Sequence, residues 1–448
     1  MRRSYRSPTI SVLLTLALAL SVVGGSQSVV VEPIRIGAVF PLTGSAAGLA
    51  GYELRGVQIA ADLVNADGGI DSRPIRLEVR DLERGSDAPA VMAALREEGI
   101  SVVIGAYGSD LSIAASQAAA AAGLVYWEAG AVADRLTGRG LPSVFRVGAA
   151  GSNLGANSAS FAAMQLAPRL GRSASQLRVA IVAADDAYAR SVADAAAATS
   201  ASLRMPIVLR AAYDLLLPDW GRVMADLASA RPDVIILASH IPDGIAFRQA
   251  MVKDGLKVGA LIGSTMAECD PDFAGELGPE AIGIFASDRP TAGFQPDALT
   301  PGARAVYNRF AAAGGWPSIE QPGGGSDSYG EGSEYAISGP GESATASARE
   351  EALSGFAAGW ALFHDVLPVA RAHGALDAQG IARAARSIDL PVGSLPNGAG
   401  LRFSDDPATL GQNERAAAVI WQWQAVRTYS FVWPATFATG PINFVPLR

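Results

Sequence analysis

Short apolar runs alternate with longer segments of helical spacing in the first third of the chain. The runs IRIGAVFPL, IRLEVRD, SVVIGAY and GLVYWEA predict strands, and the segments between them predict helices over 52–65, 88–98 and an alanine-rich stretch after 109. Strands separated by helices of about 10–15 residues are typical of βαβ units. We therefore expect a parallel sheet that is covered on both faces.

The same alternation starts again beyond residue 177. The runs LRVAIVAADD, PIVLRAAYD, DVIILASH and VGALIGST predict strands, with helices between them at 188–202, 220–232 and 246–256. The plan is that of the first unit, without a repeat at the level of residues. The sequence therefore predicts two α/β units in succession.

The pattern changes in the last third of the chain. Gly, Ser and Pro predominate over 317–347, a composition that buries too little apolar surface to order a segment. We interpret this segment as a flexible surface insertion, with a lid over a ligand as the alternative. The residues 349–373 then predict an amphipathic helix, and the aromatic alternation over 401–434 predicts a hairpin of strands.

The amino terminus has the layout of a secretory signal peptide. Residues 1–28 combine three arginines with an apolar run over 10–23 and a small polar end. An uncleaved anchor is the alternative. No Cys lies near the cleavage region, which argues against a lipid-anchored protein. No later apolar run reaches the length of a membrane helix, so we expect a soluble mature protein.

Charge and rare residues exclude several functions. The formal net charge is −8 and no basic stripe offsets it, which argues against binding to nucleic acid. Cys269 is the only cysteine, and the three histidines have no metal-ligand spacing, so we expect no internal disulfide, metal or cofactor. The chain also has no nucleophile-elbow, Walker or dinucleotide motif. We therefore expect a protein that is not an enzyme; a hydrolase that uses His240 is the distant alternative.

Polar and aromatic residues gather where predicted strands end. In an open α/β sheet, ligands bind outside the carboxyl ends of the strands, beside free N–H groups of helices. The candidate ligand-binding residues at such ends are Tyr107, Ser109, Trp127, Glu128, Gly130, Tyr188, His240 and Thr265. Because they come from both units, they predict a cleft between two lobes.

Each candidate also has a structural interpretation. Ser109 could bind a ligand carboxylate, or it could simply cap the following helix. Glu128 could pair with a ligand cation beside the ring of Trp127, or it could be an exposed acid next to a core aromatic residue. Tyr188 could contact a ligand or pack at a helix start, and His240 could donate a hydrogen bond or merely end a strand.

Seven motifs together carry a resemblance to a known family. They are IRIGAVFPLTGSAA, NADGGIDSRPIRLEVRD, VIGAYGS, LTGRG, FRVGAA, DDAYARS and VWPATFATG. The chain resembles the type I periplasmic solute-binding proteins of ABC importers, in the branch that binds leucine, isoleucine and valine. This resemblance implies an α/β fold of two Rossmann-like lobes with parallel sheets, which are joined by three crossing strands and close on a ligand by a hinge.

The resemblance also implies domain boundaries. The crossings are expected near 145–150, near 285–289 and in the C-terminal region. The expected division is a signal peptide at 1–28, lobe one at 33–147 and 287–400, and lobe two at 148–286 and 401–448, with the insertion at 317–348 inside the second part of lobe one.

Some ligand positions that the resemblance implies are kept in this chain. Ser109 falls on the serine that holds a ligand carboxylate, and Gly130 falls where a backbone carbonyl meets the ligand ammonium. Tyr188 matches a tyrosine of lobe two. Two positions differ from the family pattern. Val132 stands where the resemblance implies a threonine, and Thr265 stands where it implies an acid.

The changed positions leave the ligand class open. His240 stands where the family often has an aromatic residue. An ammonium group that is buried without a counter-charge costs several kcal/mol, and Glu128 could supply that charge. If it does not, we expect an amide, a carboxylate or a more apolar ligand, with Trp127 and Tyr107 favouring an aromatic or bulky group.

The predicted function is that of a periplasmic receptor without catalytic turnover. It would capture a small solute and deliver it to a permease and ATPase complex in the inner membrane, and we expect it to be a monomer. The alternative is a ligand sensor of the same fold that signals to a kinase or regulator.

Overall fold

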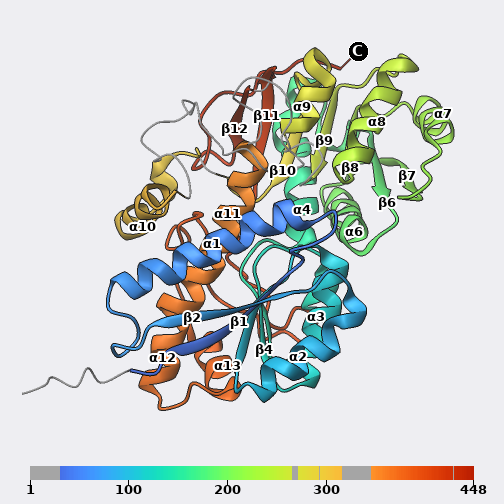
Figure 1. Ribbon diagram of the computed structural model, residues 1–448. Helices are drawn as coiled ribbons and strands as arrows, with labels where there is room; N and C mark the ends of the chain where they lie inside the picture. The colour runs from blue at the N-terminus through green and yellow to red at the C-terminus, as the bar shows by residue number, and fades with distance from the viewer. Residues whose placement is uncertain (1–30, 265–270, 292, 315–344, 427, 448) are drawn as a thin grey trace, which may run out of the picture.

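The computed structural model describes residues 31–264, 271–291, 293–314, 345–426 and 428–447 (Figure 1). The predicted signal peptide, Thr265 and nearly all of the predicted insertion lie outside these residues. The described chain forms two lobes, which lie one above the other in Figure 1.

Lobe one is built on a parallel sheet with the strand order β2-β1-β3-β4-β5. The strands are β1 (Ile34–Phe40), β2 (Ile75–Asp81), β3 (Val102–Gly105), β4 (Val125–Glu128) and β5 (Val144–Arg146). The residues of β3, β4 and β5 are all buried. Apolar residues without alternation therefore mark strands that are covered on both faces, as predicted.

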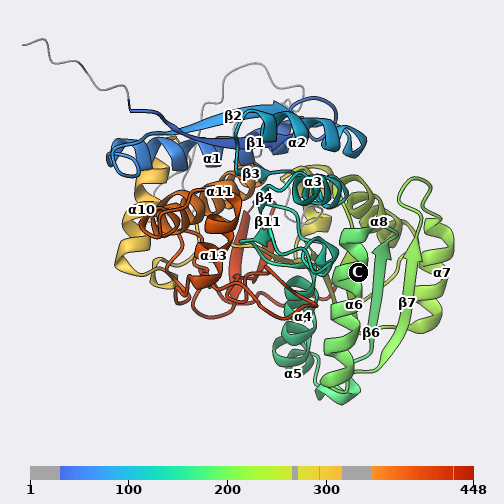
Figure 2. The same cartoon turned by 90° about the horizontal axis from the view of Figure 1, so that it is seen from below.

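Helices cover both faces of this sheet (Figures 1 and 2). One face is covered by α1 (Ala47–Ala66), α11 (Thr345–Trp360), α12 (Leu367–Ala372) and α13 (Ala378–Ser387), and the other by α2 (Ala88–Glu97) and α3 (Ser109–Ala121). Neighbouring strand residues point to opposite faces, so Trp127 packs in the core under α1 and α11, whereas Tyr126 packs under α2 and α3.

Lobe two contains a mixed sheet with the strand order β12-β11-β10-β9-β8-β6-β7. Its parallel strands are β6 (Val179–Ala184), β7 (Ile207–Tyr213), β8 (Val234–Ala238), β9 (Ala260–Ser264) and β10 (Phe285–Asp288). The chain then returns as an antiparallel pair, β11 (Val419–Ala425) and β12 (Thr428–Trp433). The predicted C-terminal hairpin is confirmed for this pair, but 401–413 forms only isolated bridges.

The helices of lobe two also lie on both sides of its sheet. They are α4 (Gly151–Phe161), α5 (Ala167–Arg169), α6 (Ala187–Ser202), α7 (Trp220–Ala230), α8 (Ile241–Lys253) and α9 (Pro271–Leu277). The chain returns from lobe two to lobe one through α10 (Pro301–Ala312), which contacts α1. Two α/β lobes, each built mainly on parallel strands, confirm the predicted fold class.

The last return to lobe two comes later than the resemblance implied. The ring of Phe403 lies 5.3 Å from Trp127 and 4.9 Å from Phe145, centroid to centroid, and both of these residues belong to lobe one. Gln412 still accepts a hydrogen bond of 2.6 Å from Arg146 Nε. Because these residues contact lobe one, we propose that the third crossing lies between 413 and 419.

The helical segment 351–372 is a core element and not the amphipathic helix that the sequence predicted. Leu353, Phe356 and Phe363 are fully buried, and a π-helical turn at Ala361–Val366 joins α11 to α12. By length and composition the segment could cross a membrane, contrary to expectation, but 78% of its most apolar window is buried inside the molecule. Its apolar residues face neighbouring helices on nearly every side.

Glycines let two pairs of helices cross at very short distance. A Cβ atom on Gly56 of α1 would lie 2.0 Å from the Ala352 carbonyl oxygen, and one on Gly355 of α11 would lie 2.0 Å from the Glu53 carbonyl oxygen. Likewise, a Cβ atom on Gly155 of α4 would lie 2.1 Å from the Val192 carbonyl oxygen of α6. Only glycine permits these approaches, since any side chain would collide with backbone. The crossing of α1 and α11 brings two buried acids together.

Candidate ligand-binding site

The two lobes meet through residues that follow the carboxyl ends of their strands. The Gly151 N–H, at the start of α4, donates to the Val132 carbonyl oxygen at 2.6 Å. The Asp134 N–H donates to Ser191 Oγ of α6 at 3.0 Å, and Asp134 Oδ1 accepts from the Ser152 N–H at 3.0 Å. We call this contact region the seam. It lies where open α/β sheets bind ligands.

Ser109 lies beside the seam but does not cap its helix. Gly108, with φ of 85°, precedes the first helical residue, and Ser109 itself opens α3. Ser109 Oγ accepts a 3.1 Å hydrogen bond from the Ala133 N–H, in the turn that contacts lobe two. The half-buried hydroxyl group thus retains a proton that it can donate to a ligand. The capping interpretation is therefore wrong for this serine.

Trp127 and Glu128 do not face a ligand together. Trp127 is fully buried, and its Nε1 donates to the Ala358 carbonyl oxygen at 2.9 Å. Glu128 Oε1 accepts from the backbone N–H groups of Gly130 and Ala131, at 2.9 and 2.7 Å. Both side chains stabilise lobe one, so we leave Trp127 out of the proposed site and give Glu128 a structural role.

The carboxyl group of Glu128 is an unusual acid because of its burial. Burial raises the pKa of Glu128 to about 7, although hydrogen bonds from Ala131, Gly130 and the Tyr126 hydroxyl group favour the charged form. Tyr126 in turn accepts from the Ala106 N–H, which ties the turn after β3 to the turn after β4. Glu128 therefore orders the two turns that carry Ser109 and Gly130.

Arg289 is a site residue that the sequence analysis missed. It follows β10, at the second crossing, and its side chain is only 6% exposed. Arg289 Nη1 donates to the Gly130 carbonyl oxygen at 2.7 Å, and Nη2 lies 3.5 Å from Glu351 Oε1. Tyr107 donates to the same Glu351 oxygen at 3.1 Å. The guanidinium group thus joins the crossing segment to Gly130 and Glu351 of lobe one.

Glu53 was also missed, although it stands on the buried face of α1 between Ala50 and Val57. It is fully buried, and among the described residues no donor reaches either carboxylate oxygen. Burial raises the pKa of Glu53 well above its usual value, and the charges of Glu351 and Glu128 raise it further. Burial and the two neighbouring acids therefore favour the neutral form of the Glu53 carboxyl group.

The lobe-two candidates form a second group. Tyr188 donates to the Ser264 carbonyl oxygen, and its ring lies 5.2 Å from that of His240. His240 Nε2 contacts Asp186 Oδ2, while Asp186 Oδ1 caps α6 by accepting from the Ala189 N–H at 2.7 Å. The structure brings Tyr188 and His240 together at the strand ends of lobe two. Thr265, the remaining candidate, lies outside the described residues.

The pKa of His240 is raised by nearby acids, chiefly Asp186. Burial alone would lower the pKa of His240, but the hydrogen bond and charge of Asp186, with the charges of Asp243 and of Asp110 in lobe one, raise it overall. The pKa of Asp186 is lowered. Burial alone would raise it, but the hydrogen bonds from His240 and the Ala189 N–H, with the charge of His240, outweigh burial. The raised pKa of His240 and the lowered pKa of Asp186 both favour the charged pair.

We expect Asp186→Asn to lower the pKa of His240, because the substitution removes the hydrogen bond and charge that favour the imidazolium form. Since the folded-state pKa of His240 is raised, its stabilisation is present below about pH 6.5 and is lost as the pH rises through the folded value. NMR titration of His240 measures the shift. The exposed neighbour Asp185→Asn is the control, and equal titration in both variants would contradict the assignment.

A hollow of about 310 Å³ lies at the opposite end of lobe one. It is lined by residues at the amino-terminal ends of β1 and β3, together with Arg73 and Leu376. Arg35 in this hollow is already paired with Glu78 and Glu98. None of the predicted site residues lines it, so we keep the seam as the candidate site.

Comparison with known proteins agrees with this geometry. Residues 33–326 match the family model described as periplasmic binding protein, and the chain belongs to this family. It is 27% identical over 413 residues to Leu/Ile/Val-binding protein homolog 8 of Brucella abortus, which covers 92% of this chain and 93% of the relative. Homolog 7 of the same organism is 25% identical over 410 residues, which is 91% of this chain and 94% of the relative.

Solved structures share the fold. The branched-chain amino acid transporter substrate binding protein LivJ from Streptococcus pneumoniae, in complex with isoleucine, has a TM-score of 0.65 and 19% identity over 90% of this chain and 100% of that chain. An ABC transporter substrate-binding protein from Desulfitobacterium hafniense, in complex with Leu, has a TM-score of 0.64 and 20% identity, over 90% of this chain and 100% of that chain. A periplasmic binding protein type 1 from Bordetella pertussis has a TM-score of 0.67 and 20% identity, over 87% of this chain and 96% of that chain. The fold is that of type I periplasmic binding proteins.

Proposed function

We propose that the protein is the extracytoplasmic substrate-binding receptor of an ABC importer. It captures a small amino acid-like solute at the seam and delivers it to a permease and ATPase complex in the membrane. The observation that supports the proposal is that the turn after β4 and helix α3 of lobe one contact helices α4 and α6 of lobe two, beside the strand ends that carry the candidate residues Ser109, Gly130, Tyr188 and His240. The predicted signal peptide supports a location outside the cytoplasm.

The connection between the lobes supports capture by hinge closure. Three crossings join the lobes, and at the second of them Arg289 is held against lobe one by Gly130 and Glu351. Rigid sheets joined by a few crossing segments favour rotation about those segments. The amino acid class is supported by the names of the Brucella relatives and by the isoleucine and leucine complexes of proteins with this fold.

Native mass spectrometry of the mature protein is the first test, because a tightly held solute stays bound through purification. A thermal-shift panel of L-leucine, L-isoleucine, L-valine and L-phenylalanine follows. A ligand present at 100 times its Kd stabilises the folded protein by about 2.7 kcal/mol, so at least one member is expected to raise the Tm measurably. The absence both of a co-purified solute and of any shift across the panel would contradict the proposal.

We expect Ser109→Ala to weaken solute binding about tenfold, because it removes one hydrogen bond to the ligand. Stability should fall by only about 1 kcal/mol, from loss of the acceptor for the Ala133 N–H. Isothermal titration calorimetry measures the first effect and urea unfolding the second. Ser202→Ala, an exposed serine of α6, is the matched control. Unchanged affinity in Ser109→Ala would remove this serine from the site.

A further inference from the structure

Among the described residues, the buried carboxyl group of Glu53 has no N–H donor, and its polar neighbour is the carboxyl group of Glu351. Within the described ranges, neither oxygen accepts a hydrogen bond from an N–H or O–H group. The adjacent carboxyl group is that of Glu351, and two carboxyl groups can form a hydrogen bond only when one of them carries a proton. A buried carboxylate without a donor is costly, so this position favours the neutral acid.

The surroundings of Glu53 hold more acids than bases. Glu351 faces it from α11 and Glu128 from β4, while Arg289 faces it from the second crossing. Among the described residues that act on Glu53, two are carboxyl groups and one is a guanidinium group, so the surroundings favour a protonated Glu53.

The position of Glu53 relates this acid to the seam. A Cβ atom on Gly130 would lie 2.0 Å from Glu53 Oε2, so the carboxyl group packs directly against the backbone of Gly130. Gly130 begins the turn whose later members, Val132 and Asp134, bond to lobe two. Only a glycine at 130 leaves room for the carboxyl group at this place.

We propose that Glu53, with Glu351 beside it, is the subsite for a positively charged nitrogen of the solute, such as an ammonium group. On binding, the ammonium group keeps its own protons, the O–H bond of Glu53 breaks, and one proton leaves to solvent. The incoming charge replaces the proton as the partner of the buried carboxylate. The inference rests on the proposed solute-binding function and names the chemical class that it captures.

Two linked observables follow from this exchange. Binding of an amine-bearing solute releases up to one proton while Glu53 is protonated in the free protein. Affinity weakens as the pH falls, by up to about tenfold for each pH unit, because protons compete with the ammonium group for the carboxylate. A solute without a cationic nitrogen shows neither effect.

Isothermal titration calorimetry in two buffers with different ionisation heats measures the proton release. The probes are L-leucine and L-phenylalanine, each compared with its deaminated acid (4-methylpentanoate or 3-phenylpropanoate) and its amine (isopentylamine or 2-phenylethylamine). The proteins are the wild type, Glu53→Gln and the control Glu98→Gln, whose carboxylate pairs with Arg35 and Arg80 at the other end of the lobe. A glutamine side chain is isosteric with the neutral acid, so the fold should be kept in Glu53→Gln; Glu351→Gln is the second variant.

The expected result is that amine-bearing probes bind with the release of about one proton, and that Glu53→Gln abolishes the release and weakens their binding roughly thirtyfold or more. Glu351→Gln also weakens them, and Glu98→Gln behaves as the wild type. Binding without proton release, or equal affinities in Glu53→Gln and Glu98→Gln, overturns the subsite. Binding of the deaminated acids alone overturns the subsite but leaves solute capture intact. Binding of no probe contradicts both the subsite and the amino acid class.

Discussion

Replacing Arg289 with methionine is expected to lower the free energy of unfolding by about 3–5 kcal/mol, since it leaves buried acids without their cation. Arg289 is only 6% exposed and holds the Gly130 carbonyl oxygen and Glu351. Methionine fills a similar volume, so the loss reports charge and hydrogen bonds and not a cavity. Urea unfolding at pH 7 measures the change.

The control for this prediction is Arg210→Met, which breaks an exposed ion pair with Asp194. Exposed pairs contribute up to about 1 kcal/mol, so its effect should be small. The deficit of the Arg289 variant should also shrink as the pH falls, because burial raises the pKa of Glu53 and of Glu128 and both lose their negative charge readily. Equal losses in the two variants, or a deficit that does not depend on pH, would contradict the role given to Arg289.

Gly355→Ala is expected to destabilise the protein by about 3 kcal/mol, although alanine is the better helix former. The added Cβ atom would lie 2.0 Å from the Glu53 carbonyl oxygen, and backbone on both sides must move to admit it. The same movement shifts Glu53 relative to Glu351, so solute affinity should fall with stability. Thermal unfolding and calorimetry measure the two effects.

Gly51→Ala is the matched control, because Gly51 lies in α1 with no atom within 4 Å of an added Cβ. This substitution is expected to stabilise the protein by up to about 1 kcal/mol. If Gly355→Ala is as stable as the wild type or more stable, α1 and α11 can separate at no cost. The close glycine contact would then not be what holds Glu53 beside Glu351.

The fold could be predicted from the sequence because its signals are local. The apolar runs that became β3 and β4 are bounded by glycine and polar residues, and the helices between them have clear periodicity. The error at 351–372 has a physical cause as well. Its few polar residues look like one face of an amphipathic helix, but Glu351 pairs with buried partners and the other faces pack against α1 and its neighbours.

The candidate site was harder to predict because it depends on contacts between distant residues. Strand alternation sends Trp127 and Glu128 to opposite faces of β4, so the two could not have acted together on one ligand. Glu53 gave one local signal, a carboxylate on the apolar face of a helix. The role of Glu53 depends on its contacts with Glu351 and Arg289, and both of these residues are distant from it in sequence.

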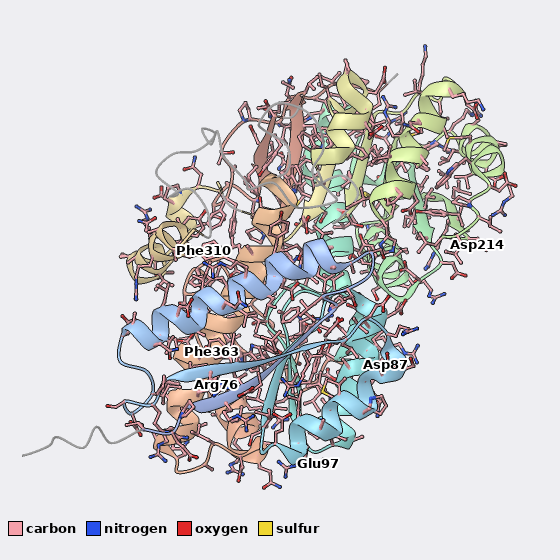
Figure 3. The ribbon with its side chains drawn as sticks, viewed as in Figure 1. Arg76, Asp87, Glu97, Asp214, Phe310 and Phe363 are labelled. Atoms are coloured by element: carbon pink, nitrogen blue, oxygen red, sulfur yellow. The ribbon has the colours of Figure 1, made fainter. Side chains whose placement is uncertain are left out.

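The central claim is that a solute bound at the seam closes the two lobes, and the distance between spin labels tests it most directly. Glu97, at the far end of lobe one in Figure 3, and Asp226, on α7 of lobe two, are both exposed. Each is replaced by cysteine in a Cys269→Ser background, and double electron–electron resonance is recorded with and without the solute identified by mass spectrometry or the thermal-shift panel. The account predicts a shift to a single altered interlobe distance at saturation. An unchanged distance distribution, with binding shown by calorimetry in the same sample, would contradict it.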